Sequence, residues 1–160
     1  MEAETHPLDL EAQLDRAEAL CAREGVRLTE LRRQVLSLVL GASRPMGAYD
    51  LLDQLRAQRR GAAPPTVYRA LEFLMTHGLI HKVERLSAFV GCPLHDHAEG
   101  HAHAAQFLIC GGCGTVRELE DAPVREALEQ AAARLGFRIG GVTIEAEGRC
   151  SACTGLSGSV

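Results

Sequence analysis

The chain has 160 residues, six cysteines, seven histidines and a net charge of −4. This length suits one ordinary domain or two small ones, and no segment approaches the ~20 apolar residues that a membrane span requires. The acidic N-terminus has no apolar run behind it, so we expect no signal peptide and a cytoplasmic protein. In that compartment paired cysteines favour metal binding over disulfides.

The charge is unevenly distributed along the chain. Residues 22–89 carry eleven Lys and Arg against six Asp and Glu, whereas the remainder carries six basic and fifteen acidic residues. A basic segment in an acidic protein is a reason to look for a nucleic-acid face there. The alternative is a solvated surface with a modest positive balance.

Hydrophobic spacing predicts four helices in the first half of the chain. They are expected over residues 9–23, from Thr29 to Gly41, over 47–58 and from Thr66 to Gly78. Thr29 is the predicted N-cap of the second helix, and Gly78 is the predicted C-cap of the fourth. Two short strands follow at 79–83 and 88–91. Helices followed by a two-stranded ribbon are typical of a winged helix-turn-helix.

The fourth helix is the expected recognition helix, which would lie in the major groove of DNA. Its outward side carries Tyr68, Arg69 and Glu72, next to Thr66. An arginine can bond a guanine edge or a phosphate, and a tyrosine can reach backbone oxygens. The alternative is a surface helix of a small α-domain with no nucleic-acid partner.

Residues 92–106 form a segment rich in metal-binding side chains. It contains Cys92 and four histidines, which are His95, His97, His101 and His103. Its proline and glycine suggest a hinge. We therefore expect a first domain over 1–91, a hinge over 92–106 and a second domain over 107–160.

The second domain is predicted to be a small β-β-α-β unit, so the expected fold class is α+β. Strands are expected at 107–110 and 115–119, and a third strand contains Val142, Ile144 and Ala146. Asp121 is the predicted cap of the intervening helix. The expected inner face of that helix consists of Val124, Leu128, Ala131 and Leu135.

Two Cys-x-x-Cys pairs, Cys110/Cys113 and Cys150/Cys153, are the strongest single motif of the chain. Four thiolates delivered as two tight pairs suit a tetrahedral structural zinc ion. The 36 residues between the pairs exceed the about 15–20 of a usual ribbon, so the insert must contain structure. Two disulfides or a redox dithiol are the rival interpretations. We expect neither pair to open a helix after a strand, as a redox motif of the thioredoxin type does.

Three segments together resemble the ferric uptake regulator family, and within it the zinc uptake regulator branch. They are the run Pro64-Pro-Thr-Val-Tyr-Arg-Ala-Leu-Glu-Phe-Leu, the ribbon His81-Lys-Val-Glu and the two cysteine pairs. The resemblance covers about residues 10–153. Members of this family are homodimeric, metal-dependent repressors with an N-terminal winged helix and a C-terminal dimerisation domain.

The resemblance therefore implies a zinc-responsive transcriptional repressor that binds an AT-rich palindromic DNA operator and controls zinc uptake genes. It implies DNA contacts from Tyr49, Thr66, Tyr68 and Arg69. The alternative for Tyr49 is a packing residue between helices. It also implies that the strands and helix after residue 106 form the dimer interface. No membrane and no small-molecule substrate are expected as partners.

The resemblance implies a second, regulatory zinc site, so at least two Zn²⁺ ions per subunit are expected. The matching ligand positions are His81, Cys92, His103 and Glu118. A metal held by ligands from both domains would fix the angle between them and couple metal binding to DNA affinity. A set of one cysteine, two histidines and one carboxylate suits Zn²⁺, with iron or another metal as the alternative.

Several ligand assignments stay open at this stage. His101 lies two residues from His103 and could replace it, and Glu120 could replace Glu118 if the strand register differs. His95 and His97, together with His101, form either an additional weaker metal site or a solvated loop.

Three further side chains have simpler interpretations. Cys21 is expected to be a core thiol. His77 lies at a helix C-terminus, where the helix dipole favours it, and is not expected to be a ligand. Asp53 and Arg56, at i and i+3, either pair within their helix or bridge adjacent dimers on the operator, as in the family.

Two other functional classes compete with the repressor. A hydrolase or redox enzyme would need an open zinc position or a general base at H-E-x-x-H spacing, and neither is present. The chain is therefore expected not to be an enzyme, and no catalytic residue is assigned. A zinc-storage module would explain the histidines but not Tyr68 and Arg69.

Overall fold

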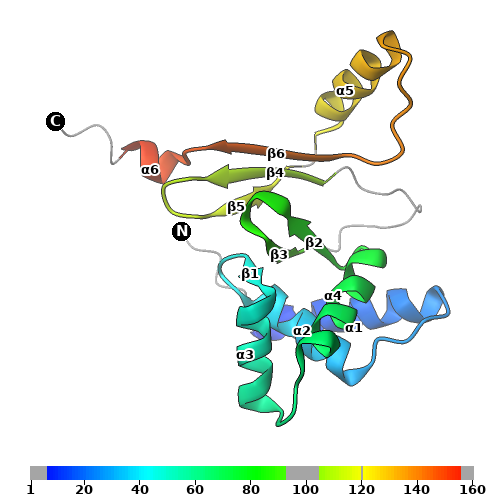
Figure 1. Cartoon of the computed structure of the whole chain (residues 1–160), viewed down its shortest axis with the longest axis vertical. Coiled ribbons are helices and arrows are strands. Elements are labelled where there is room, and N and C mark those ends of the chain that lie inside the picture. Colours follow the sequence, from blue (N-terminus) through cyan, green and yellow to red (C-terminus); the bar gives the residue numbers. More distant parts are fainter. Residues whose placement is uncertain (1–6, 93–104, 120, 156–160) are drawn as a thin grey trace. The chain divides into compact units, whose positions relative to one another are not determined.

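The computed structural model describes residues 7–92, 105–119 and 121–155 (Figure 1). The chain divides into two compact units, unit 1 over Met1–Glu99 and unit 2 over Gly100–Val160. Each unit is described by itself below. None of the helices in the described ranges has the length and apolar character that crossing a membrane requires.

Unit 1 consists of four helices and a small antiparallel sheet. The helices are α1 (Pro7–Arg23), α2 (Glu30–Gly41), α3 (Ala48–Gln58) and α4 (Pro64–Thr76). The strands are β1 (Met46–Gly47), β2 (Ile80–Val83) and β3 (Ala88–Gly91), in the order β1-β3-β2. A short 3₁₀ helix, η1 (Glu84–Leu86), joins β2 to β3. This is the winged helix-turn-helix that the sequence predicts.

Three details of unit 1 differ from the prediction. The C-cap of α4 is His77 rather than Gly78, which follows it with φ +66°. Helix α4 begins at Pro64 rather than at Thr66, with Ala63 as its N-cap. Both prolines fit in the first turn, because the N–H that proline lacks has no partner there. Strand β1 was missed because its two residues are too few to show an alternating pattern. It pairs with β3, with Met46 opposite Phe89.

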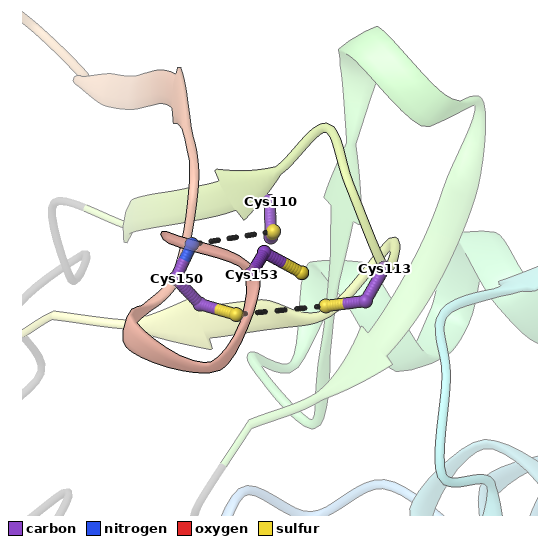
Figure 2. A group of neighbouring side chains, drawn as sticks. All are labelled: Cys110, Cys113, Cys150 and Cys153. Atoms are coloured by element: carbon purple, nitrogen blue, oxygen red, sulfur yellow. Dashed lines mark hydrogen bonds between the residues drawn. The ribbon is translucent and has the colours of Figure 1, made fainter. Parts of the chain in front are cut away.

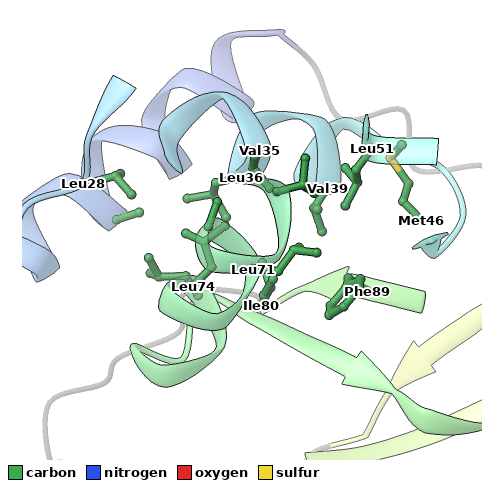
Figure 3. Close-up of a cluster of buried hydrophobic side chains, with 14 of the residues drawn as sticks. Leu28, Val35, Leu36, Val39, Met46, Leu51, Leu71, Leu74, Ile80 and Phe89 are labelled. Carbon is green, nitrogen blue, oxygen red and sulfur yellow. The ribbon is translucent and has the colours of Figure 1, made fainter. Parts of the chain in front are cut away.

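The core of unit 1 is formed by the apolar faces of the four helices and one face of the sheet (Figure 3). Helix α4 contributes Val67, Ala70, Leu71 and Leu74, each at most 3% exposed. Because one face of α4 is buried in this core, the opposite face is exposed to solvent. Cys21 is 1% exposed within the same core, which confirms that it is a core thiol. Burial raises the pKa of the Cys21 thiol.

Polar contacts at the surface join α1 to α2. Thr29 caps α2, since its hydroxyl accepts from the backbone N–H of Arg32 at 3.5 Å. The guanidinium of Arg33 lies 2.9, 2.9 and 3.0 Å from carboxylate oxygens of Glu11, Asp15 and Glu18, respectively. These carboxylates are largely exposed, so each pair stabilises the fold only modestly. Their shared arginine fixes the side of α1 that faces α2.

Unit 2 has the predicted β-β-α-β order. Its elements are β4 (Ala105–Cys110), β5 (Val116–Glu118), α5 (Ala122–Arg134), β6 (Thr143–Gly148) and a short helix α6 (Ser151–Gly155). The sheet order is β5-β4-β6, with β4 antiparallel to β5 and parallel to β6. The parallel pair places Cys110 opposite Gly148, so the two strands end at the same edge of the sheet.

The predicted inner face of α5 is wrong, because the structure leaves its residues exposed or only partly buried. Within the described helix α5 no residue is buried, and Val124 and Leu128 are 39% and 40% exposed. Leu135, just after the helix, is 85% exposed. Figure 1 shows α5 near the ends where strands β4 and β6 begin, away from α6. The helical spacing was correct, but the described residues of unit 2 leave the apolar side of this helix exposed.

Candidate metal centre and nucleic-acid interface

The two cysteine pairs meet in unit 2 (Figure 2). Cys110 ends β4 and Cys113 lies in the turn that follows, whereas Cys150 precedes α6 and Cys153 lies within it. The parallel pairing of β4 with β6 brings both knuckles to one edge of the sheet. As a result, the four sulfur atoms all lie within 4.8 Å of one another.

Backbone hydrogen bonds and glycines shape the first knuckle. The N–H of Cys110 donates to the carbonyl of Thr115, and the N–H of Gly114 donates to the carbonyl of Cys110, both at 2.9 Å. Gly114 has φ +74°, a conformation that favours glycine. A Cβ on Gly112 would lie 3.0 Å from Cys153 Sγ. Glycine at these two positions therefore allows the chain to fold tightly around the sulfurs.

The geometry and the donor set both fit Zn²⁺. Cys113 Sγ and Cys150 Sγ are 3.7 Å apart. A tetrahedral zinc ion with Zn–S bonds of about 2.3 Å places its ligands about 3.8 Å apart, whereas a disulfide needs about 2.05 Å. Cys110, Cys113 and Cys150 form no disulfide. Four sulfur ligands would fill the coordination sphere and leave no position for water or substrate, which suits a structural ion.

The electrostatic environment favours thiolates at the first knuckle. The backbone N–H of Cys150 donates to Cys110 Sγ at 3.3 Å, and with the N–H groups of Cys113 and Gly112 it lowers the pKa of Cys110 to about 5. Hydrogen bonding to Thr115, at 3.1 Å, lowers the pKa of Cys113. The sulfurs around Cys153 raise its pKa to about 12. All four cysteines can be thiolates together only with a cation between them, a charge that Zn²⁺ would supply.

One argument against a redox motif is wrong for the second pair. Strand β6 ends at Gly148 and α6 begins at Ser151, so Cys150 does stand between a strand and a helix. The sequence did not reveal α6 because five residues are too few for a periodic pattern. The redox interpretation still lacks support, because the sulfurs of both pairs converge on one point.

The expected ligands of the regulatory site are only partly within the described chain. His95, His97, His101, His103 and Glu120 lie outside the described residues. In unit 1, His81 lies on β2 and Cys92 follows β3, and their ligand atoms are within 4.8 Å of each other. Cys92 is 3% exposed, and its N–H donates to the carbonyl of Leu79 at 3.1 Å.

Glu118, the expected ligand from unit 2, is the last residue of β5 and lies opposite Phe107 of β4. Paired residues of an antiparallel sheet point to the same face. The side chain of Glu118 therefore shares a face with a phenylalanine that is only 1% exposed.

The expected DNA-contacting side chains are accessible on unit 1. On α4, Tyr68 is 51% exposed and Arg69 is exposed, while Thr66 is half-buried in the first turn. Tyr49, in the first turn of α3, is 74% exposed, which excludes the alternative that it packs between helices. Arg56 donates from Nε to the carbonyl of Ala62 at 3.2 Å, a contact that the sequence did not predict.

The sequence analysis missed Thr115 as a partner of the metal centre. Its hydroxyl and its backbone carbonyl both contact the first knuckle. The available signal was its position two residues after Cys113, where the returning strand begins. It also assigned no contact to His77, whose imidazole lies 2.6 Å from the carboxylate of Glu24.

Comparison with known proteins gives a consistent result. Residues 23–147 match the model of the Ferric uptake regulator family. Over 140 residues the chain is 43% identical to the zinc uptake regulation protein of Escherichia coli (strain K12), covering 88% of this chain and 80% of that protein. Over 132 residues it is 31% identical to the zinc uptake regulation protein of Mycobacterium tuberculosis (strain ATCC 25618 / H37Rv), covering 81% and 95%.

Solved structures agree with this similarity. A zinc uptake regulator complexed with zinc and DNA is 40% identical, with a TM-score of 0.86 over 94% of this chain and 98% of that chain. The crystal structure of holo XcZur is 42% identical, with a TM-score of 0.80 over 90% and 98%.

Proposed function

Because the chain belongs to the ferric uptake regulator family, we propose that it is a zinc-responsive transcriptional repressor rather than an enzyme. It binds an AT-rich palindromic operator as a homodimer in the cytoplasm and controls zinc uptake genes. The observation that carries this proposal is the similarity of nearly the whole chain to a regulator that was solved with both zinc and DNA.

The DNA face is the outward side of α4 together with the first turn of α3. Arg69 reads a base edge or holds a phosphate, Tyr68 and Tyr49 contact the DNA backbone, and Thr66 lies at the start of the helix. The support for this assignment is the exposure of Tyr68 and Arg69 on α4, whose other face is buried, and the exposure of Tyr49 in the first turn of α3.

Two kinds of zinc site serve different purposes, so each subunit binds at least two Zn²⁺ ions. The tetrad Cys110, Cys113, Cys150 and Cys153 holds a structural ion that stabilises the fold of unit 2. His81, Cys92, His103 and Glu118 hold the regulatory ion. The support for the second site is the proximity of His81 to Cys92 in unit 1 and the family position of the other two ligands.

Regulation follows from where these ligands lie along the chain. We assign residues 1–91 to the winged-helix DNA-binding domain, 92–106 to a hinge with metal ligands, and 107–160 to the dimerisation and structural-zinc domain. The last two residues of this hinge already belong to strand β4, which begins at Ala105. An ion bound by ligands from both domains fixes their mutual angle. Two recognition helices must lie one helical turn, or a multiple of it, apart on the duplex, so fixing the angle increases operator affinity.

Dimerisation uses unit 2. The apolar side of α5 and the residues that follow it are exposed in a single chain, with Leu135 at 85% and Phe137 at 71%. Exposed apolar side chains that cluster in this way are typical of an interface. A second copy of unit 2 supplies the cover that the helix lacks.

The decisive experiment measures DNA binding while free zinc is varied. Fluorescence anisotropy of a labelled AT-rich palindromic duplex is followed at buffered zinc concentrations, and bound zinc is counted in parallel. We expect a moderate chelator to remove the regulatory ion and abolish operator binding while the tetrad keeps its ion. A further zinc ion bound only at higher zinc concentrations would be assigned to His95, His97 and His101.

Cys92→Ser is the matched variant for this experiment. It should remain a folded dimer that keeps the tetrad ion, yet bind the operator weakly at every zinc concentration. Operator affinity that does not change with zinc, in the wild type, would contradict the proposed function. Loss of the fold in Cys92→Ser would show that the role of Cys92 is not purely regulatory.

A further inference from the structure

His77 has no part in the metal sites or in the proposed DNA face, yet it makes specific contacts. It is the C-cap of α4, and its backbone N–H donates to the carbonyl of Phe73 at 3.1 Å. Its Nδ1 lies 2.6 Å from Oε2 of Glu24, just after α1. The His77 side chain is only 18% exposed. This short contact therefore joins the C-terminal end of the recognition helix to the end of α1.

Two stacking contacts extend from His77 to α2. The rings of Phe73 and His77 have centroids 4.4 Å apart with an interplanar angle of 46°. The guanidinium carbon of Arg32 lies 3.6 Å from the centroid of the Phe73 ring. Arg32 also donates from Nη1 to the carbonyl of Arg27 at 2.7 Å, which holds its guanidinium in place. We call Glu24, Arg32, Phe73 and His77 the α4 clamp.

The clamp acts on one flank of α4. With about 100° per residue, Phe73 and His77 lie one turn apart, between the face buried in the core and the face that carries Arg69. The core contacts of Leu71 and Leu74 hold the inner face of the helix against the unit. Contacts on a flank instead resist rotation of the helix about its own axis. The core alone provides less of this restraint, because aliphatic contacts are non-directional.

The direction of α4 matters because its DNA-facing residues are far from the clamped end. Tyr68 is nine residues from His77, a distance of about 13 Å along a helix. A small tilt at the C-terminal end of α4 therefore moves Tyr68 and Arg69 by a larger distance than it moves His77. Hydrogen bonds to base edges tolerate only a range of about 2.7–3.2 Å.

We propose that the α4 clamp of Glu24, Arg32, Phe73 and His77 positions the recognition helix for operator binding. Its members are positioning residues that act through contacts inside unit 1 rather than through contacts with DNA. The inference rests on the proposed function, since it assumes that α4 reads the operator.

The test compares operator affinity of His77→Ala, Glu24→Gln and the double variant by fluorescence anisotropy at saturating zinc. We expect each single variant to bind about 3- to 10-fold more weakly, the size of a typical coupling between contacting residues. The double variant should bind the operator as well as the single variant with the lower affinity, because both changes break the same contact between His77 and Glu24. Glu11→Gln is the matched control, since Glu11 is a carboxylate of α1 that pairs with Arg33 instead of His77. It should bind like the wild type.

Two readouts separate positioning from other roles. The slope of log affinity against log salt should stay unchanged, because no phosphate contact is lost. Arg32→Lys, which keeps a cation near the ring, should retain more affinity than Arg32→Met. A shallower salt slope in His77→Ala would mean that His77 contacts phosphate itself, and equal affinity of all variants would overturn the proposal.

Amide hydrogen exchange of α4, measured on the free protein, keeps the inference separate from the proposed function. Clamp variants should exchange faster over residues 73–77 while the amides of α1 change little. If the wild type does not bind the operator, the proposed function is wrong. If the clamp variants exchange the amides of α4 at the same rate as the wild type, the clamp itself is wrong. If His77→Ala melts too early to measure, Glu24→Gln, with its side chain 43% exposed, carries the same test.

Discussion

At the residue scale, the two sets of cysteines in this protein differ in what surrounds their sulfur atoms. The sulfur of Cys110 receives backbone N–H groups and has its pKa lowered to about 5, whereas burial raises the pKa of Cys21. A thiol that ionises easily among three other sulfurs is suited to a metal, and a thiol buried among leucines behaves as a small apolar side chain. Cysteine is thus a proposed metal ligand at Cys110 and a packing residue at Cys21.

Cys113→Ser should remove one zinc ion per subunit and lower the melting temperature by about 10 °C or more, because a structural zinc ion contributes directly to folding free energy. The measurement is elemental zinc analysis together with thermal melting. Cys92→Ser is the comparison variant and should keep the melting temperature of the wild type. An unchanged zinc content in Cys113→Ser would show that the tetrad is not the structural site.

Arg69→Ala should weaken operator binding by about 1–3 kcal/mol if its guanidinium reads a base edge. The measurement is the dissociation constant on the operator and on an unrelated duplex of equal length. A loss on the operator alone identifies base reading. An equal loss on both duplexes identifies a phosphate contact, and unchanged affinity would remove Arg69 from the interface.

At the element scale, the helix ends follow local rules that hold in both units. Thr29 caps α2, and Asp121 caps α5 by accepting from the N–H of Val124 at 3.1 Å. Both caps were predicted from sequence, because a cap depends on residues two or three positions away. The buried face of α4 was predicted for the same reason. The apolar side of α5 is different, because it is exposed in the described chain and the proposed dimer would cover it.

Asp121→Ala should lower the free energy of unfolding by about 1 kcal/mol, since it leaves the first turn of α5 without its side-chain acceptor. Chemical denaturation of the zinc-loaded protein measures this change. Asp121→Asn is the matched control and should stay close to the wild type, because asparagine caps helices equally well. If both variants lose the same stability, the charge of Asp121 matters rather than the cap.

At the scale of the whole molecule, the two units supply different parts of one task. Unit 1 has an apolar core and presents the exposed side chains of the proposed DNA face. Unit 2 holds the four-cysteine cluster and leaves the apolar side of α5 exposed. A small unit with a thin core benefits from a metal ion and from a second copy, and the proposed dimer provides both.

Leu135→Glu should shift the protein from dimer to monomer, because a charge cannot be buried in an apolar interface without a partner. Sedimentation velocity measures the shift, and operator affinity should fall with it because one subunit reaches only one half-site. Gln130→Glu, on the opposite side of α5, adds the same charge and should leave the dimer intact. A fully dimeric Leu135→Glu would place the interface elsewhere in the chain.

The sequence by itself determined the features that depend on neighbours a few residues apart. The four helices of unit 1, the caps at Thr29 and Asp121 and the two knuckles follow from helical spacing, capping chemistry and the Cys-x-x-Cys repeat. The resemblance of residues 64–74 to a known family then indicated DNA binding from the sequence alone.

Only the tertiary structure decided which distant segments meet. The parallel pairing of β4 with β6 brings Cys110 and Cys150 together across the sheet, and no local spacing specifies that register. The contact of Glu24 with His77 joins residues 53 positions apart, and the exposure of α5 depends on what packs against it. Such contacts result from the packing of whole elements, which a periodic pattern in one segment cannot encode.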